Sequence, residues 1–504
     1  MIIKIALLLI FIITTVAIGI VCRRHSTDVG GFVLGGRSVG PWLTAFAYGT
    51  SYFSAVIFIG YAGQFGWKFG IASTWIGIGN AVLGSLIAWI VLGRRTRTMS
   101  QFYSSSTMPD FFGKRYASPA LGLASAIIVF IFLIPYTASL YNGLSRLFEM
   151  AFKVDYVICI AVMALLTCVY VVVGGYMATA INDFIQGIIM LAGIVAVVLA
   201  VVNVNGGFAE AFKSLSGITD TGIPEGSLSS LFGPEPFNLF AVVILTSLGT
   251  WGLPQMVGKF YAIKDAGSIR KGTIVSTVFA LIVAGGCYFL GGFGRLYSES
   301  VPTTDSGVIY DAIVPTMLKG LPDLLVAFVV ILVLSASMST LSSLVLTSSS
   351  TLTLDLIKPL AKGRLTEKRQ LTVMRLLVVF FVAVSAVIAI LQYKFNFAFI
   401  AQLMGLSWGA LAGAFLAPFL YGLYWKRTTV ASVFASFGFG VGVMILNAVL
   451  PSVFPTWLRS PINCGAFVML VSLVLVPVVS LLTPAPSKKV TDGFEAAKSA
   501  NNGK

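Results

Sequence analysis

Hydroxyl side chains crowd into a stretch of the chain that otherwise has the composition of a buried helix. The apolar run Leu324–Leu334 passes without a turn signal into SASMSTLSSLVLTSSSTLTLDL, residues 335–356. On a helix, residues three or four positions apart lie on one face. Three hydroxyl residues of this stretch share such a face with an alanine: Ala336, Ser339, Thr340 and Ser343.

This hydroxyl face has the chemistry of a cation site. The adjacent pairs Ser339/Thr340 and Ser342/Ser343 lie within about two helical turns of each other. Hard cations such as sodium take oxygen ligands, and uncharged oxygens suit an ion that must also leave. One helix supplies too few oxygens, so we expect free carbonyls at a break in another helix to complete the shell. The alternative, hydroxyls that only bond their own helix or allow close packing, accounts well for residues 347–353.

A carboxylate also lies within an apolar part of the chain. Asp183 occurs in GGYMATAINDFIQGIIM, residues 174–190, between two apolar runs with almost no loop. An ionisable residue at membrane depth usually serves a function. The alternative is that Asp183 caps the start of the following helix.

The elements that must position these residues are membrane-spanning helices. The chain has 504 residues, of which 57% are hydrophobic and 10% are charged, and its mean hydropathy is +0.95. A soluble domain usually carries about 25% charged residues. Runs of about 20 apolar residues can cross a bilayer as helices, and they lack the period-two alternation of a membrane β-barrel. We therefore expect an all-α membrane protein.

The net charge of +15 does not indicate nucleic-acid binding. No basic stripe carries interleaved aromatic residues. Short basic connections instead alternate with poorly basic ones, which is the pattern of a protein whose basic loops face the cytoplasm. The basic connections are Arg23/Arg24/Arg37, 93–98 with Lys114/Arg115, 264–271, 358–369, Lys426/Arg427 and Lys488/Lys489.

Thirteen spans satisfy this charge pattern if the N-terminus lies outside the cell and the C-terminus in the cytoplasm. The first apolar run lacks a clear cleavage site and is followed by Arg23 and Arg24, so we expect it to be retained. The expected spans are roughly 2–21, 40–65, 69–93, 118–148, 155–175, 180–203, 237–262, 271–293, 323–355, 370–392, 396–424, 428–450 and 462–483.

Two of these spans are interrupted in the same way. Small residues break the second span within Ala47–Gly66, and small residues with Pro254 break the seventh within Leu245–Gly258. Equivalent broken helices separated by five spans indicate an inverted repeat with the solute bound at the breaks. Small residues that merely allow close helix packing are the alternative.

The motifs resemble those of the sodium:solute symporter family over nearly the whole chain. The resemblance rests on segments in the family's order and spacing: residues 32–63, 171–190, 253–266 and ASMSTLSS at 336–343. It implies about thirteen transmembrane helices and a LeuT-type five-plus-five inverted repeat. The implied units are 1–39, a first helix and cytoplasmic loop; 40–204, the first repeat; 205–236, an extracellular loop; 237–425, the second repeat; 426–483, two further helices; and 484–504, a cytoplasmic tail.

The same resemblance implies sodium ligands. The family's principal site uses carbonyls of the second span, which match Thr50 and Phe53. Its ninth span supplies a carbonyl and two hydroxyls, which match Ala336, Ser339 and Thr340. Some members hold a further sodium ion, and the matching residues are Asp183, Ser342 and Ser343. With that second cage, we expect two sodium ions to be coupled to each solute.

The solute is expected to be an amino acid or a similar zwitterion, such as proline. The sequence is most similar to the sodium/proline branch in residues 134–149 and 260–266, but Tyr52, Thr246 and Thr250 depart from that branch. We see no Arg or Lys at either break, so an anionic solute would rely on helix N-termini. The expected solute contacts are Tyr52, Ser54, Tyr136, Thr246, Thr250, Trp251 and Gln402.

Other function classes fit less well. The only histidine, His25, lies in a basic loop, and HExxH and Walker A motifs are absent, so we expect no enzyme. The tail 484–504 is too short to be a signalling domain. A sodium-coupled sugar or carboxylate symporter, or a proton-coupled carrier of the same fold, remains the alternative. The expected partners are the solute, sodium and the lipid of the cell membrane, with no nucleic acid and no obligate protein partner.

Overall fold

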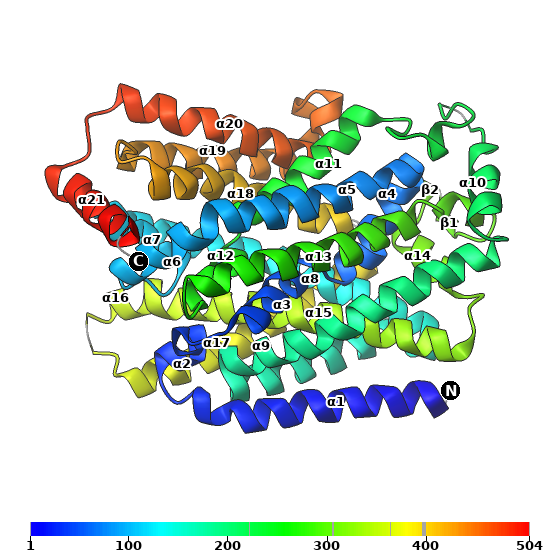
Figure 1. The fold of residues 1–504 in the computed structure, drawn as a ribbon, viewed down its shortest axis with the longest axis horizontal. Helices are drawn as coiled ribbons and strands as arrows, with labels where there is room; N and C mark the ends of the chain where they lie inside the picture. The colour runs from blue at the N-terminus through cyan, green and yellow to red at the C-terminus, as the bar shows by residue number, and fades with distance from the viewer. Residues whose placement is uncertain (1, 221, 305–306, 363, 396–399, 503–504) are drawn as a thin grey trace.

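The computed structural model describes residues 2–220, 222–304, 307–362, 364–395 and 400–502. Long helices run side by side along the molecule (Figure 1). Ten helical stretches among the described residues are long and apolar enough to cross a membrane, or eleven if one bent pair forms a single span. The long helices are α1 (Ile2–Cys22), α8 (Pro119–Phe152), α9 (Tyr156–Val204), α13 (Gly267–Gly291), α15 (Asp323–Thr351), α17 (Glu367–Phe395), α18 (Ile400–Tyr424), α19 (Val430–Val449) and α20 (Pro461–Leu482).

The first four residues of the expected span 396–424 and the last two of the expected tail, 503–504, lie outside the described residues.

Shorter elements complete the bundle and its ends. The shorter helices are α2 (Val29–Leu34), α3 (Pro41–Tyr52), α4 (Ala62–Phe69), α5 (Thr74–Gly79), α6 (Arg94–Phe102), α7 (Met108–Arg115), α10 (Phe208–Ser216), α11 (Pro236–Leu248), α12 (Pro254–Ala262), α14 (Ile313–Leu318), α16 (Lys358–Leu360) and α21 (Lys488–Asn502), beside the small hairpin β1 (Thr303–Thr304) and β2 (Gly307–Val308).

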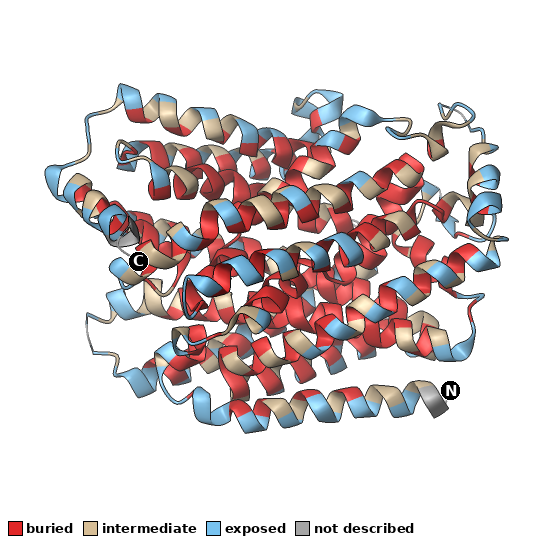
Figure 2. Cartoon of the chain, viewed as in Figure 1, coloured by how far each residue is buried: buried red, intermediate tan, exposed pale blue. Residues whose placement is uncertain are grey.

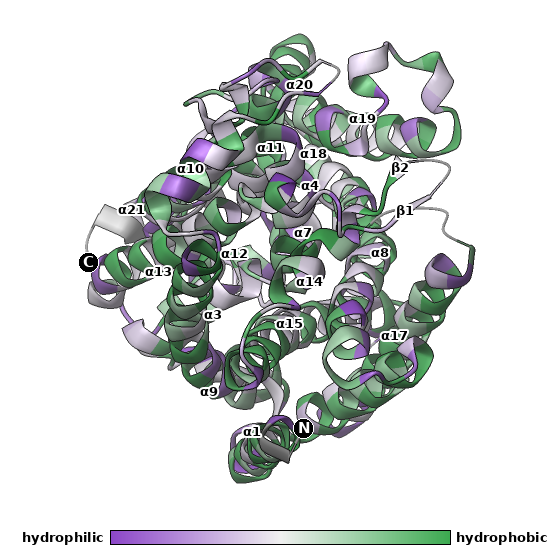
Figure 3. Cartoon of the chain, turned by 90° about the vertical axis from the view of Figure 1, so that its right-hand side faces the viewer, coloured by the Kyte–Doolittle hydropathy of each residue, from purple (hydrophilic) through white to green (hydrophobic). Residues whose placement is uncertain are grey.

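The bundle has a buried centre and an apolar outer surface. In the most apolar stretches of α15 and α18, 83% and 89% of the residues are buried, against 22% in α1 at the rim (Figure 2). Large apolar side chains stay exposed on the peripheral helices, and Figure 3, which looks at the bundle from one end, colours much of these helices as hydrophobic. A surface of this kind is suited to lipid rather than water. The hydroxyl-rich helix α15 is therefore a central element.

The second expected span is interrupted at its middle. Helix α3 ends at Tyr52, and Phe53 is extended, with φ −82° and ψ 125°. Helical geometry resumes at Ala55, followed by a π-helical segment over Val56–Tyr61. Because the ladder of helical hydrogen bonds stops at such a break, nearby carbonyls become free for other partners.

The seventh expected span is interrupted as well. Helix α11 continues through a tight 3₁₀ turn, Gly249–Gly252, to Leu253, which is extended with φ −87° and ψ 121°. Pro254 then begins α12, where its missing N–H costs nothing. The two halves bend by 47°.

Helix α9 contains a break of its own. A continuous helix of its 49 residues would be about 74 Å long, more than twice the thickness of a bilayer core. Gly175 adopts φ 57° and ψ −154°, which is not helical and is open to glycine rather than to residues with a Cβ. A Cβ there would also lie 2.9 Å from the ring of Phe32. This position divides α9 into two segments.

The connections with many basic residues gather at one end of the bundle. Helices α2, α6, α7, α16 and α21 lie together at the end that carries the C-terminus, while α10, α14 and the β-hairpin lie at the other end with the N-terminus (Figure 1). The two ends therefore differ in charge as the sequence predicts.

Candidate cation and solute sites

The break after α3 meets the hydroxyl face of α15 at Thr340. The Thr340 hydroxyl oxygen lies 3.2 Å from the Thr50 carbonyl oxygen and 3.2 Å from that of Phe53. It also lies 3.1 Å from the Ala336 carbonyl oxygen, one turn back on its own helix. Four of the five oxygens expected for the principal sodium site thus converge, and the residues that supply them are buried.

Ser339 supplies the fifth expected oxygen. Its side chain is buried, and its hydroxyl has no hydrogen-bond partner within the described ranges. A buried hydroxyl without a partner is costly, and a bound cation would relieve that cost. The donor set of carbonyl and hydroxyl oxygens suits sodium, so the residues present fit the ion.

Asp183 and Ser343 lie around a basic side chain, Lys259. The Lys259 ammonium donates to the Ser343 hydroxyl at 2.9 Å and lies 3.7 Å from an Asp183 carboxylate oxygen. The Ser51 hydroxyl is 2.7 Å from that of Ser343. Ser342 instead donates to the Ser339 carbonyl of its own helix, at 2.9 Å. Asp183 is inside a continuous helical stretch of α9, so the interpretation of a helix cap is wrong.

Lys259 is not at either break, but it is a buried basic residue that the sequence analysis did not consider. It belongs to α12, which begins at Pro254, and its side chain is only 3% exposed. Its ammonium also lies 5.2 Å from the centre of the Tyr176 ring. The signal was present in the sequence, because the expected span 237–262 already included this lysine.

Two of the expected solute contacts, Tyr52 and Tyr136, pack against Trp408 of α18, a residue that sequence reasoning missed, and a third lies beside Tyr136. The ring centres of Tyr52 and Tyr136 each lie 5.8 Å from that of Trp408, and Ser54 lies near the Tyr136 hydroxyl. The side-chain polar atoms of all four residues are buried and have no hydrogen-bond partner within the part of the chain that the structure describes. Such a group of unsatisfied polar atoms beside two aromatic faces is suited to a small polar ligand.

The other expected solute contacts are arranged differently. Thr246 bonds the Val242 carbonyl at 2.8 Å and lies beside the Tyr52 hydroxyl. Thr250 bonds the Ser247 carbonyl at 2.8 Å, and the Trp251 indole N–H donates to the Leu83 carbonyl at 3.0 Å. The Thr250 hydroxyl and the Trp251 indole N–H therefore already donate hydrogen bonds within the protein. Gln402 is half-buried in the first turn of α18.

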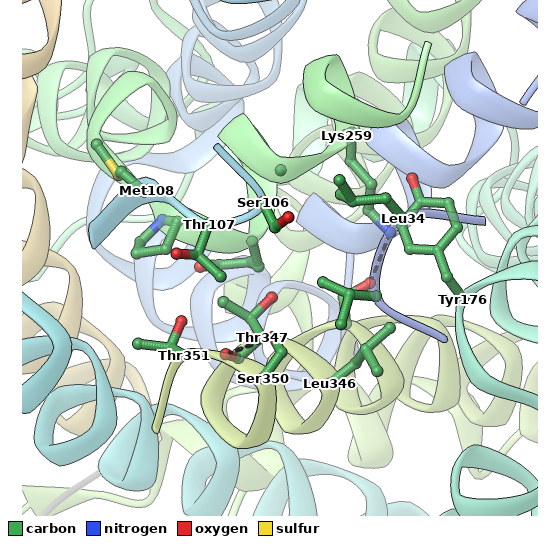
Figure 4. A pocket seen from close by; sticks show the side chains of 15 residues that line it. Leu34, Ser106, Thr107, Met108, Tyr176, Lys259, Leu346, Thr347, Ser350 and Thr351 are labelled. Atoms are coloured by element: carbon green, nitrogen blue, oxygen red, sulfur yellow. Dashed lines mark hydrogen bonds between the residues drawn. The ribbon is translucent and has the colours of Figure 1, made fainter. Parts of the chain in front are cut away.

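A small hydroxyl-lined cavity extends from Lys259 toward the basic end of the bundle. It has a volume of about 40 Å³, which is enough to hold water. Figure 4 shows Lys259 and Tyr176 at one side of it and the hydroxyls of Thr107, Thr347, Ser350 and Thr351 at the other. A separate cleft of about 530 Å³, lined by Gln64, Lys68, Glu235 and Asn463 among others, opens near the start of α11.

Comparison with known proteins identifies the family of the chain. Residues 32–440 match the model of the sodium:solute symporter family. The osmoregulated proline transporter OpuE of Bacillus subtilis is 27% identical over 95% of this chain and 94% of its own. A sodium/proline symporter of Staphylococcus aureus is 28% identical over 95% of this chain and 92% of its own.

A solved structure shares the fold. A Na⁺-coupled sialic acid symporter in its substrate-bound, outward-open state superposes with a TM-score of 0.75 at 15% identity, over 96% of this chain and 98% of that one. The resemblance seen in the sequence motifs is confirmed by the family match over residues 32–440. This chain belongs to the sodium:solute symporter family.

Proposed function

We propose that this symporter imports a small zwitterionic solute, an amino acid such as proline, together with sodium across the cell membrane. The observation that carries the proposal is the convergence of the Thr340 hydroxyl on the Thr50 and Phe53 carbonyls. These oxygens come from a helix break and from a separate helix. Movement of one helix past the other would assemble or disperse the site, as alternating access requires.

The proposed topology has thirteen spans in a five-plus-five inverted repeat over 40–204 and 237–425. The breaks at Phe53 and Leu253 and the division of α9 at Gly175 support it. The N-terminus lies outside and the C-terminus in the cytoplasm, because the basic connections then face the cytoplasm.

The proposed solute site lies beside the break after α3, next to the principal sodium site. Tyr52, Ser54 and Tyr136 with Trp408 form its polar and aromatic wall, and Thr246 lies next to it. Thr250, Trp251 and Gln402 complete the proposed contacts on the side of α11 and α18. A zwitterion would satisfy the free hydroxyls while the Trp408 ring covers its apolar part.

The direct test is an uptake screen in proteoliposomes with labelled proline, other amino acids, sugars and carboxylates, each with and without a sodium gradient. We expect proline or a similar zwitterion to enter, with uptake at least tenfold faster in sodium than in choline. Sodium-dependent uptake of only a sugar or a carboxylate would contradict the solute class. Uptake that follows a proton gradient and ignores sodium would contradict the coupling ion.

Removing a single hydroxyl at the solute wall should weaken solute binding selectively. In Tyr52→Phe and Tyr136→Phe we expect the KM for the solute to rise about five- to tenfold, the value of one buried hydrogen bond. The sodium concentration for half-maximal uptake should change by less than about twofold. A control is Tyr116→Phe, whose hydroxyl bonds the Pro418 carbonyl at 2.7 Å away from this wall. Unchanged KM values in both Tyr52→Phe and Tyr136→Phe would show that the solute binds elsewhere in the protein.

A further inference from the structure

A buried ion pair lies beside the principal sodium site. Asp183 of α9 and Lys259 of α12 come from different helices and are 0% and 3% exposed. The carboxylate lies near Ser339, one of the expected sodium ligands. Buried charges are expensive unless they are paired, so a lysine in this position calls for an explanation.

We propose that the Lys259 ammonium is a built-in cation that takes the place of a second sodium ion. The inference deepens the proposed function and rests on it, because it concerns the number of ions that the same transporter couples. From the sequence, two sodium ions are expected to be coupled to each solute, and this proposal reduces that number to one. Asp183 and Ser343, expected as ligands of the second ion, are the groups that the ammonium engages.

The contacts of the ammonium are those a small cation would make. It donates to the Ser343 hydroxyl at 2.9 Å and lies 3.7 Å from an Asp183 carboxylate oxygen. It faces the Tyr176 ring at 5.2 Å, and the Ser51 hydroxyl lies 2.7 Å from that of Ser343. A carboxylate, a hydroxyl and a π-face are all suited to positive charge.

A sodium ion added here would meet an unfavourable balance of charge. The negative charge of Asp183 is already offset by Lys259, so a further cation would leave the buried cluster with net positive charge. Like charges at such short distances repel strongly where water is scarce. The third expected ligand, Ser342, also turns its hydroxyl to the Ser339 carbonyl of its own helix.

The position of Lys259 at the cavity strengthens this assignment. The cavity of about 40 Å³ is lined by Lys259 and Ser343 and by hydroxyls nearer the basic end of the bundle (Figure 4). An ion leaving the Asp183 cluster along that side would have to pass the ammonium. A tethered cation cannot leave with the solute, so it would neutralise Asp183 without being transported.

The test counts sodium ions. Equilibrium binding of radiolabelled sodium to the purified full-length protein in lipid nanodiscs needs no knowledge of the solute. We expect one ion per protein in the unmodified chain and two in Lys259→Met, because Asp183 then lacks its partner and the space is free. The conservative variant Lys259→Arg should still bind one sodium ion per protein, because it retains the positive charge.

A charge-balanced double variant guards against misfolding of the single one. Asp183→Asn/Lys259→Met removes both charges together, and we expect it to retain one ion at the principal site. Two ions in the unmodified protein, falling to one in the double variant, would overturn the inference in favour of a second sodium cage. A correctly folded Lys259→Met that still binds one ion would overturn it as well.

The outcomes for the two proposals can be told apart. If no solute shows sodium-dependent uptake, the proposed function fails whatever number of ions binds. If uptake is sodium-dependent but two ions bind to the unmodified protein, only the inference about Lys259 fails.

Discussion

Replacing Thr340 by alanine is expected to raise the sodium concentration for half-maximal uptake at least tenfold, a loss of about 1.4 kcal/mol or more. The Thr340 hydroxyl lies within 3.2 Å of two carbonyl oxygens from the α3 break and 3.1 Å from one on its own helix. Its removal deletes a ligand at the centre of the proposed site. Alanine remains a good helix former, so the amount of protein in the membrane should be roughly preserved.

Two further variants make this experiment decisive. Ser339→Ala should have a similar effect, because it removes the hydroxyl that has no partner among the described residues. The matched control is Ser337→Ala on the same helix, whose buried hydroxyl only bonds the Val333 carbonyl at 2.8 Å. For all three alanine variants, the sodium concentration for half-maximal uptake is measured by titrating solute uptake with sodium. Wild-type sodium dependence in both Thr340→Ala and Ser339→Ala would show that these hydroxyls only pack.

Local pattern and chemistry pointed to particular segments of the chain. The density of hydroxyls at residues 335–343 singled out a face of one helix, and small residues with Pro254 indicated the broken segments. The structure has α15 at the centre of the bundle and irregular backbone at Phe53 and Leu253. The prediction that the Thr50 and Phe53 carbonyls meet the ninth-span hydroxyls rested on the family resemblance. Spacing along a chain does not give the register between two helices.

The parts that were missed depend on packing between distant segments. Lys259 looks like one more base at the end of an apolar run, and only the fold brings it to Asp183, 3.7 Å away. Trp408 lies in an apolar helix where an aromatic residue carries no signal of its own. Ser342 counted as a ligand by type, but its hydroxyl bonds a carbonyl of its own helix. Side-chain direction, rather than residue type, separates ligands from neighbours in such a cluster.

The number of coupled ions sets how steep a solute gradient this protein can build. A tenfold sodium gradient supplies about 1.4 kcal/mol, and a membrane potential of about −100 mV adds about 2.3 kcal/mol per charge. One sodium ion with a neutral solute therefore supplies about 3.7 kcal/mol, which limits accumulation to about 500-fold. Two ions would supply about 7.4 kcal/mol and raise the limit to the order of 10⁵.

With Lys259 in the place of the second ion, we expect accumulation to stop at the lower limit. Proteoliposomes held at about −100 mV with a tenfold sodium gradient should reach an internal-to-external solute ratio near 500 and no higher. The ratio should fall about tenfold when the sodium gradient is removed and the potential kept, because one ion contributes one factor of ten. With two ions it would fall about 100-fold, since each ion contributes the same factor. Leakage lowers the plateau but cannot raise it, so a plateau well above 500 would rule out coupling to a single sodium ion.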